Sequence, residues 1–492
     1  MKKNKKLNIH WEVKVMKYDL IIKNGKVVSP SNTIKTDIGI INGKIFTLGD
    51  LKNFEAKKII DASEKYVMPG VIEAHMHCMA PFQGCLGAND FFQQSVSGAF
   101  GGVTMFMDFA NVFKGKSVYE AVKERVKEMS ISAIDYSVHG KFVESNEKII
   151  NEIDLLIEYG IPTFKMFMTY KKEGVMSDDE TLLKIFKKAK SVNGLPMLHC
   201  ESNAIAEMNI ENCVKNNKLT WMDFAECKPV LCEAEAFSRA TFFAKMMDTP
   251  ILVVHTTNKI ALDIAREAHR NEFPIYVETC PHYLTLFKDQ YEKKDGHLAI
   301  CSPPLRTKKE AEELWDGIKD GTISLTGSDD CTYSYKEKSM FLERDEKANI
   351  IPDFRKVVNG TSGLEIRLPI LLSEGVSKNR ISINKVVEIT STNIAKVYGC
   401  YPQKGIIAPG SDADIVIVDM EKEVTLSKDI LHNNIDYCLH EGLKIKGYPI
   451  MTISKGNIIM EEGEFKGRKG DGNFIRRNIN RKYLKKFNLN DD

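Results

Sequence analysis

The chain is 492 residues long, enough for one large domain and a smaller one, and its 43% hydrophobic and 28% charged residues are ordinary for a globular protein. A formal net charge of +2 gives no general reason to expect nucleic acid or a membrane surface as a partner. The basic N-terminus lacks the apolar stretch of a signal peptide, and no apolar run approaches the length of a membrane span, so a cytoplasmic location is expected. The 11 cysteines are scattered and include no Cys-x-x-Cys pair, so reduced thiols are expected.

The N-terminal part is predicted to be rich in β-strands. Residues 1–15 are expected to be an extension detached from the fold. Met16 heads the first strand, so we expect it to be an alternative or true start, which the intact mass of the native protein would test. Residues 18–28 are predicted to be two strands joined by an Asn24-Gly25 hairpin turn, and residues 38–45 a second such pair. Together, residues 16–68 predict a small all-β module.

From residue 69, short apolar runs alternate with amphipathic stretches, which predicts a parallel sheet wrapped by helices. The eight predicted strands end within residues 75–77, 103–108, 136–139, 164–167, 196–199, 251–255, 274–278 and 324–329. Helices are expected between them, for example over 118–129, 147–159 and 177–190, the last starting with a Ser177-x-x-Glu180 capping box. This pattern predicts an α/β fold, a (β/α)8 barrel, over residues 69–399.

After the barrel the β pattern returns. Residues 404–419 and 447–460 carry strand and turn signals, but too few for an independent sheet. We therefore expect residues 400–464 to pair with residues 16–68 as one small β-sandwich domain formed by N- and C-terminal segments. Residues 465–492 are polar and basic without an apolar period, and a loose or oligomer-contacting tail is expected there rather than a nucleic-acid-binding segment.

Polar residues recur at the ends of the predicted strands, the face where such barrels carry their active sites. His75 and His77 are two residues apart on one strand and so face the same side. The residues at this face are His75, His77, Lys165, His199, His255 and Asp329. Each alone is more often an ordinary rim residue, but four of the chain's 11 histidines at strand ends indicate a shared site. Imidazoles and a carboxylate suit zinc or a similar divalent ion, and these are enough for two ions.

Lys165 differs from the other members because it stands in an apolar run, 164–168. A buried ammonium is costly, so its pKa should be depressed or its charge removed by chemical modification. The alternative, that it extends to the surface or pairs with a carboxylate, stays open on the sequence alone.

These motifs resemble those of the cyclic amidohydrolases, in particular the hydantoinase and dihydropyrimidinase branch. The resemblance extends from Tyr18 to about Gly467. Its motifs are His75-x-His77 and residues 164–170, 198–201, 254–257, 301–306, 327–329 and 441–449. It implies two divalent metal ions per subunit, expected to be Zn²⁺, and a carbamylated Lys165 (N6-carboxylysine) that bridges them. His75, His77 and Asp329 would hold one ion, and His199 and His255 the other.

The activity that the resemblance implies is hydrolytic ring opening of a small cyclic amide, a hydantoin or a 5,6-dihydropyrimidine, to the N-carbamoyl amino acid. Asp329 would act as general base and acid, and Tyr170 would donate a hydrogen bond to the oxyanion. The backbone of Ser302 and Asn359 would contact the amide edge of the ring. An ordinary rim tyrosine at 170 and a purely turn-shaping Ser302 are the alternatives. The resemblance also implies that the protein forms a homotetramer.

The chain departs from the family pattern at two positions. Glu73 stands where aspartate is common, and Asp330 follows Asp329 where histidine is common. A second carboxylate beside Asp329 is expected to raise the pKa of Asp329 or to change which ring substituent is accepted.

Three other functions fit parts of this pattern. Dihydroorotase is disfavoured because no arginine follows His77 in the stretch 78–82. Allantoinase, and a non-catalytic scaffold protein of the same fold, remain alternatives. Residues 79–86 and Phe167 are rather apolar and suit an uncharged or hydrophobic ring substituent.

Overall fold

Eight parallel strands form the centre of the computed structural model, which describes residues 17–484. They pair in chain order from β8 to β15, and a bridge between Met76 and Asp330 links the first strand to the segment after the last. The strands are β8 Val71–Met76, β9 Val103–Phe109, β10 Asp135–Lys141, β11 Thr163–Phe167, β12 Leu195–His199, β13 Ile251–Val253, β14 Ile275–Thr279 and β15 Leu325–Thr326. The predicted α/β barrel is thereby confirmed, whereas the predicted extension 1–15 and the start at Met16 lie outside the described residues.

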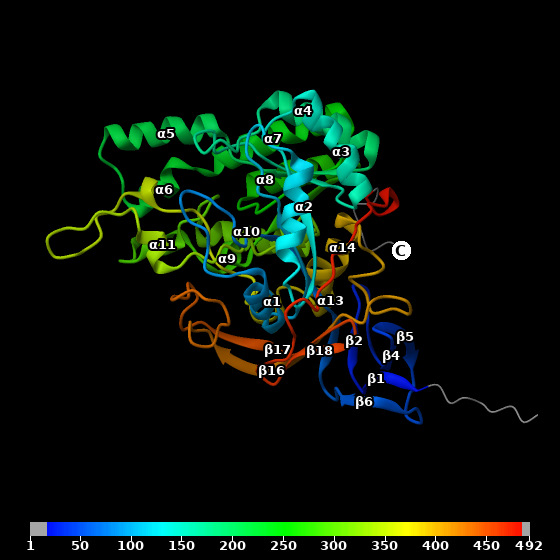
Figure 1. Ribbon diagram of the computed structural model, residues 1–492. Coiled ribbons are helices and arrows are strands. Elements are labelled where there is room, and N and C mark those ends of the chain that lie inside the picture. The colour runs from blue at the N-terminus through cyan, green and yellow to red at the C-terminus, as the bar shows by residue number, and fades with distance from the viewer. Residues whose placement is uncertain (1–16, 485–492) are drawn as a thin grey trace, which may run out of the picture.

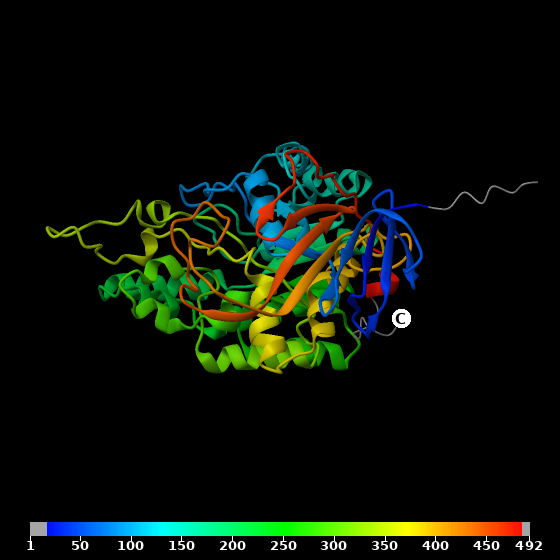
Figure 2. The same ribbon diagram turned by 90° about the horizontal axis from the view of Figure 1, so that it is seen from below.

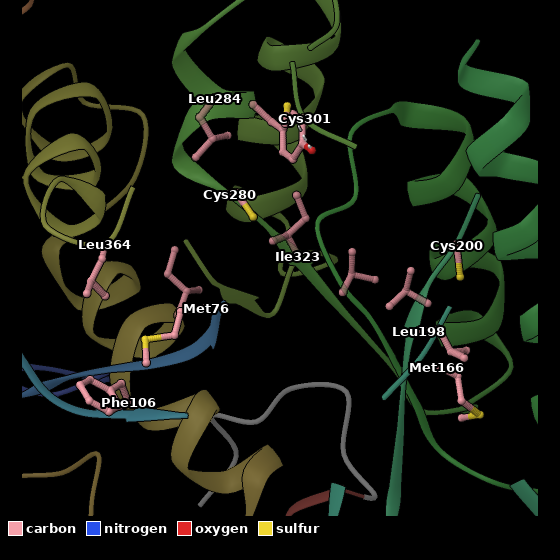
Figure 3. Close-up of a cluster of buried hydrophobic side chains, with 14 of the residues drawn as sticks. Met76, Phe106, Met166, Leu198, Cys200, Cys280, Leu284, Cys301, Ile323 and Leu364 are labelled. Atoms are coloured by element: carbon pink, nitrogen blue, oxygen red, sulfur yellow. Dashed lines mark hydrogen bonds between the residues drawn. The ribbon is translucent and has the colours of Figure 1, made fainter. Parts of the chain in front are cut away.

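The barrel strands are buried on both faces, which explains their continuous apolar runs. Inward side chains such as Met105, Met197 and Leu252 fill the barrel. Outward side chains such as Phe106, Met166 and Leu198 belong to the larger core under the helices, part of which Figure 3 shows. The polar strand ends therefore lie above a dry, rigid interior.

Helices surround this sheet (Figure 1). The longer ones are α1 Phe91–Phe100, α2 Val118–Met129, α3 Glu147–Tyr159, α4 Asp179–Val192, α5 Asn203–Lys215, α7 Val230–Met247, α8 Lys259–Arg270 and α10 Lys308–Lys319. The shorter ones are α6 Trp221–Cys227, α9 Pro281–Thr285, α11 Tyr335–Ser339, α12 Arg367–Ile370, α13 Ile383–Val387 and α14 Asn393–Tyr398. Short helical segments are η1 Lys288–Glu292, η2 Gly296–Ala299, η3 Phe354–Lys356, η4 Leu371–Ser377, η5 Glu388–Thr392 and η6 Arg481–Leu484.

The start of α4 differs from the prediction. Its N-cap is Asp178, whose side chain accepts a hydrogen bond from the backbone N–H of Thr181 at 2.9 Å. Ser177 Oγ instead donates to the carbonyl of Phe142 at 2.6 Å, so it faces the sheet and the predicted capping box is wrong. The predicted spans 118–129 and 147–159 agree with α2 and α3.

Two sheets, with mostly antiparallel strand pairs, form the β-sandwich. One has the order β5-β4-β1-β6 and the other β19-β18-β17-β16-β7-β2-β3, so the second combines strands from both ends of the chain. Figure 2 shows the C-terminal strands beside the N-terminal ones. Apolar side chains of both sheets, among them Leu20, Ile40 and Ile415, meet in one core. The predicted sandwich of N- and C-terminal segments is therefore present.

The strands of the sandwich come from two stretches of the chain. The N-terminal strands are β1 Tyr18–Lys23, β2 Lys26–Val28, β3 Thr33–Lys35, β4 Asp37–Ile41, β5 Lys44–Gly49, β6 Ala56–Asp61 and β7 Tyr66–Pro69. The C-terminal strands are β16 Ile415–Thr425, β17 Lys444–Ser454, β18 Asn457–Glu461 and β19 Glu464–Phe465. The two stretches join where β16 pairs with β7.

The two Asn-Gly pairs behave differently. Asn42-Gly43 joins the antiparallel strands β4 and β5, as predicted. Asn24-Gly25 does not form a hairpin, because β1 pairs with β4 and β6 whereas β2 pairs with β3 and β7. The chain instead crosses here from one sheet to the other. A Cβ atom on Gly25 would lie 2.5 Å from Val67 Cγ2, so the crossing needs glycine.

The segment after β19 docks on the barrel through residues 475–479, so a loose tail is wrong for that part, and the oligomer-contacting alternative stays a prediction. Ile475 and Ile479 pack in the core that fills the barrel. Arg477 is buried, and its guanidinium donates to Ser137 Oγ at 2.9 Å and Thr163 Oγ1 at 2.9 Å. The segment is extended and binds the barrel through single side chains. For this reason its sequence shows neither a helical nor a strand period.

Two further findings concern the cysteines and the possibility of a membrane-spanning helix. All 11 cysteines lie within the described residues and none forms a disulfide, as expected. Between residues 17 and 484, no helix is both long enough and apolar enough to cross a membrane.

Candidate metal centre

A pocket lies at the C-terminal ends of the barrel strands, with about 780 Å³ of empty space including its open mouth. All the site residues singled out in the sequence line it: His75, His77, Lys165, Tyr170, His199, His255, Ser302, Asp329 and Asn359. Segments far apart in the chain thus meet at one place.

His75, His77 and Asp329 form one side of the site. The two histidines leave β8 on the same face, and Asp329 Oδ1 lies 3.0 Å from His75 Nε2 and 3.1 Å from His77 Nε2. His75 Nδ1 lies 2.6 Å from Glu278 Oε1, so this carboxylate accepts the Nδ1 proton and Nε2 faces the site. Asp329 has a φ of 48°, a left-handed conformation that is uncommon for a residue other than glycine.

His199 and His255 form the other side, with ring centroids 4.4 Å apart. His199 Nε2 lies 2.6 Å from Glu201 Oε2, which leaves Nδ1 directed elsewhere. His255, whose φ is 41°, has a buried Nδ1 without a hydrogen-bond partner among residues 17–484. Ligand atoms of His75, His255 and Asp329 lie within 4.8 Å of one another.

Lys165 is fully buried between these groups. Its Nζ has no hydrogen-bond partner in the described part of the chain and lies 5.1 Å from the Phe109 ring centroid and 4.9 Å from that of Phe167. Burial lowers the pKa of Lys165 to about 8, despite the charge of Asp329.

Burial lowers the pKa of His199 to about 4 and that of His255 well below its usual value, which favours the neutral, metal-binding form of both imidazoles. Burial also acts on His75, but the charges of Glu278 and Asp329 raise its pKa to about 9. The buried nitrogens of His255 and Lys165 lack hydrogen-bond partners within residues 17–484 and lie beside other imidazoles and a carboxylate. This arrangement fits a site for divalent metal ions.

One other cluster of carboxylates, Asp135, Asp412 and Asp414, lies among the described residues. Lys404 Nζ lies 2.6 Å from Asp135, 3.0 Å from Asp412 and 2.5 Å from Asp414. This cluster is a buried ion-pair network rather than a metal site.

Tyr170 follows β11 with a φ of 65°, and its hydroxyl accepts a hydrogen bond from Asn359 Nδ2 at 3.4 Å. Burial raises the pKa of the Tyr170 phenol well above its usual value, so it stays protonated and able to donate. Ser302 Oγ donates to Glu201 Oε2 at 2.6 Å and also contacts Lys228 Nζ. The backbone N–H of Asn359 donates to Gln83 Oε1 at 3.1 Å.

The two departures from the family pattern lie outside the predicted metal ligands. Glu73 is buried beneath the site, where it accepts from the His75 N–H at 2.8 Å and pairs with Arg367 Nε at 3.2 Å. Asp330 accepts from the backbone N–H of Gly363 at 2.6 Å and Leu364 at 3.0 Å.

The expected rise in the pKa of Asp329 is not observed overall, because other groups outweigh any effect of Asp330. Burial raises the pKa of Asp329, but the charge of His75 and hydrogen bonds from His75 and His77 outweigh it, so the pKa lies well below its usual value. The Asp330 carboxylate accepts from backbone donors, while burial and the charge of Asp329 raise its pKa, and its effect on the accepted ring substituent stays a prediction.

Several supporting residues were not identified from the sequence. Glu201 and Glu278 orient His199 and His75, and Lys228 joins Glu201 at 3.2 Å to Ser302. Glu278 lies at the end of the predicted strand 274–278, and this strand-end position is the sequence signal that could have indicated it. Lys228 lies just after α6, outside the strand pattern, and no sequence signal marks it.

Comparison with known proteins gave consistent results. The amidohydrolase family matches residues 66–459. A D-hydantoinase from Ralstonia pickettii is 37% identical over 468 residues, covering 94% of this chain and 99% of its own, and a D-phenylhydantoinase from Escherichia coli O1:K1 is 34% identical over 473 residues, covering 93% and 98%. The crystal structure of dihydropyrimidinase from Brevibacillus agri NCHU1002 superposes with a TM-score of 0.89 at 35% identity, covering 93% of this chain and 98% of that one.

Proposed function

The chain belongs to the amidohydrolase family, and on this basis we propose that it is a cyclic amidohydrolase of the hydantoinase and dihydropyrimidinase type. It opens the ring of a hydantoin or a 5,6-dihydropyrimidine by hydrolysis to the N-carbamoyl amino acid. The observation that carries this proposal is the convergence of four histidines, Lys165 and Asp329 in one pocket with Tyr170.

The same residues would hold two divalent metal ions, which we propose to be Zn²⁺. His75, His77 and Asp329 would bind one ion, and His199 and His255 the other, with carbamylated Lys165 between them. The burial of the Lys165 amine without a hydrogen-bond partner in the described residues supports this, because carbamylation turns an unpaired ammonium into an anionic ligand. When bound, such ions lower the pKa of water and polarise the scissile carbonyl.

The protein's own groups would handle the protons. Asp329 would accept a proton from the attacking water and deliver it to the departing ring nitrogen. The protonated Tyr170 hydroxyl would donate to the oxygen that gains charge. The backbone of Ser302 and Asn359 would contact the amide edge of the ring, through groups other than the Asn359 N–H, which already donates to Gln83.

The decisive experiment is a ring-opening assay on metal-quantified protein with dihydrouracil, 5-substituted hydantoins and allantoin. We expect turnover of a hydantoin or dihydrouracil in preference to allantoin. Preference for allantoin would favour the allantoinase alternative, and full zinc occupancy without hydrolysis of any cyclic amide would favour the scaffold alternative. The hydantoinase and dihydropyrimidinase relatives disfavour both.

Two properties extend the proposal. A homotetramer is proposed from the family resemblance, and light scattering after size-exclusion chromatography would measure it. A cytoplasmic location is proposed because the cysteines are free thiols, which suit a reducing compartment.

A further inference from the structure

Lys141 places a second positive charge in the wall of the pocket. It is the last residue of β10 and pairs in register with Lys165 on β11, so both side chains project from the same face of the sheet. Both residues line the pocket. Unlike Lys165, Lys141 has no part in the proposed metal site.

The Lys141 ammonium forms no direct ion pair within the described part of the chain, although the charge of Asp108 acts on it. Among residues 17–484 it makes no ion pair or side-chain hydrogen bond, and its described contact is with the Phe113 ring, whose centroid lies 5.8 Å from Nζ. The nearby carboxylate of Asp108 is already bound by Arg125 at 3.1 Å and by the Cys78 N–H at 2.9 Å. Glu144 accepts from the backbone N–H of Gly115.

Apolar side chains also line the pocket into which Lys141 projects. Ala80, Pro81 and Phe82 contribute one part of the wall, and Phe109 and Phe167 line it from β9 and β11, the strands on either side of the lysine. Lys141 is half-buried, so its ammonium is partly dehydrated, and an anion beside it would be favourable. Because the substrate must enter this pocket, the substrate itself can carry the anion.

We propose that Lys141 binds a carboxylate carried by the ring substituent, so that the preferred substrate of this enzyme is an anionic cyclic amide. This inference rests on the proposed ring-opening function. It departs from the uncharged substituent that the apolar residues 79–86 suggest, because Lys141 adds a charge that those residues do not balance. No arginine follows His77 in the stretch 78–82, so Lys141 on β10 is the residue that would supply a positive charge for the substituent.

The test compares two rings that differ in charge but little in shape, 5-(carboxymethyl)hydantoin and 5-(carbamoylmethyl)hydantoin. For the metal-loaded wild-type protein, we expect kcat/KM to favour the carboxylate by about tenfold or more, as for a charge-assisted hydrogen bond in a poorly hydrated site. Lys141→Met and Lys141→Gln should abolish this ratio, while Lys141→Arg should keep part of it.

The matched control is Lys114→Met, which removes an exposed lysine from the loop after β9 and should retain the wild-type ratio. A wild-type protein that does not favour the carboxylate would overturn the inference. So would neutral variants at 141 that keep the preference.

Failure of the proposed function gives a different result. If the metal-loaded protein opens neither ring, ring opening is excluded for these substrates, and calorimetric titration with the two unreacted rings then tests Lys141 alone. Tighter binding of the carboxylate that Lys141→Met removes would still support the inference. Equal binding of both rings would contradict it.

Discussion

Three residues of the site hold a left-handed backbone conformation although none is glycine. Tyr170, His255 and Asp329 have φ values of 65°, 41° and 48°. Such conformations cost free energy and persist where the surrounding structure enforces them, often at functional sites. Here each follows a barrel strand and turns its side chain into the pocket, so the packed sheet fixes the geometry of the proposed chemistry.

Replacing Tyr170 by Phe removes the proposed oxyanion donor and keeps the ring. We expect kcat to fall by about 10²-fold, the usual effect of losing one such donor, with metal content unchanged. Steady-state kinetics and metal analysis of the same samples would measure both. Tyr159→Phe on α3 is the control and should leave kcat unaltered. Wild-type turnover in Tyr170→Phe would remove the oxyanion role.

Replacing Lys165 by Ala should remove both metal and activity, because the proposed bridging carboxylate is lost. Short carboxylates such as acetate or propionate should restore part of each by occupying the space. Metal per subunit is measured by atomic emission, with and without the added acid. The exposed Lys187→Ala on α4 should keep full occupancy. Full occupancy in Lys165→Ala would argue against a bridging lysine.

At the scale of elements, local signals predicted what local interactions determine. The spans of α2 and α3 follow from their amphipathic pattern and from Ser117 and Asn146 caps. The strand-end residues of the site could be predicted because strand polarity alone brings them to one face. The predicted hairpin at Asn24-Gly25 is wrong because the choice between a hairpin and a crossing depends on distant strands. The partners of Glu201 and Glu278 likewise depend on tertiary contacts.

The docked C-terminal segment yields a prediction of its own. Arg477 also donates to the carbonyls of Tyr398 and Val138, so Arg477→Ala would leave several buried acceptors unpaired. We expect a loss of about 3 kcal/mol in the free energy of unfolding. Urea unfolding measures it, with the exposed Arg468→Ala as a control that should change little. An unaltered midpoint in Arg477→Ala would show that the hydrogen bonds of Arg477 do not stabilise the fold.

At the scale of the whole molecule, the barrel and sandwich are joined by buried charges. Lys404 connects Asp135 of the barrel to Asp412 and Asp414 beside the sandwich, and these carboxylates hold its pKa well above the usual value against the effect of burial. We propose that residues 16–68 with 400–464, and residues 69–399, are two domains linked in this way. The sequence could not predict the link, because its members are far apart in the chain.

Buried neutral histidines make the stability of the molecule sensitive to acid. Burial lowers the pKa of His269 to about 4, that of His297 to about 4 and that of His440 to about 3. The unfolded chain therefore binds protons more readily than the folded one. Each histidine stabilises the fold fully above about pH 6.5 and loses that contribution as the pH falls toward the folded pKa.

His297 offers the cleanest test, because neither ring nitrogen has a hydrogen-bond partner among the described residues and the ring packs near Trp221 and Tyr335. Between pH 7.5 and 5.0 its contribution to the free energy of unfolding should fall by about 2 kcal/mol. His297→Phe keeps an aromatic ring and removes the titrating group, so the variant should lose that much less stability than the wild type over the same interval. Urea midpoints at both pH values, on samples of equal metal content, measure the difference, because metal loss in acid would otherwise destabilise both proteins. An equal loss in the two proteins would mean that protonation of His297 does not limit acid stability.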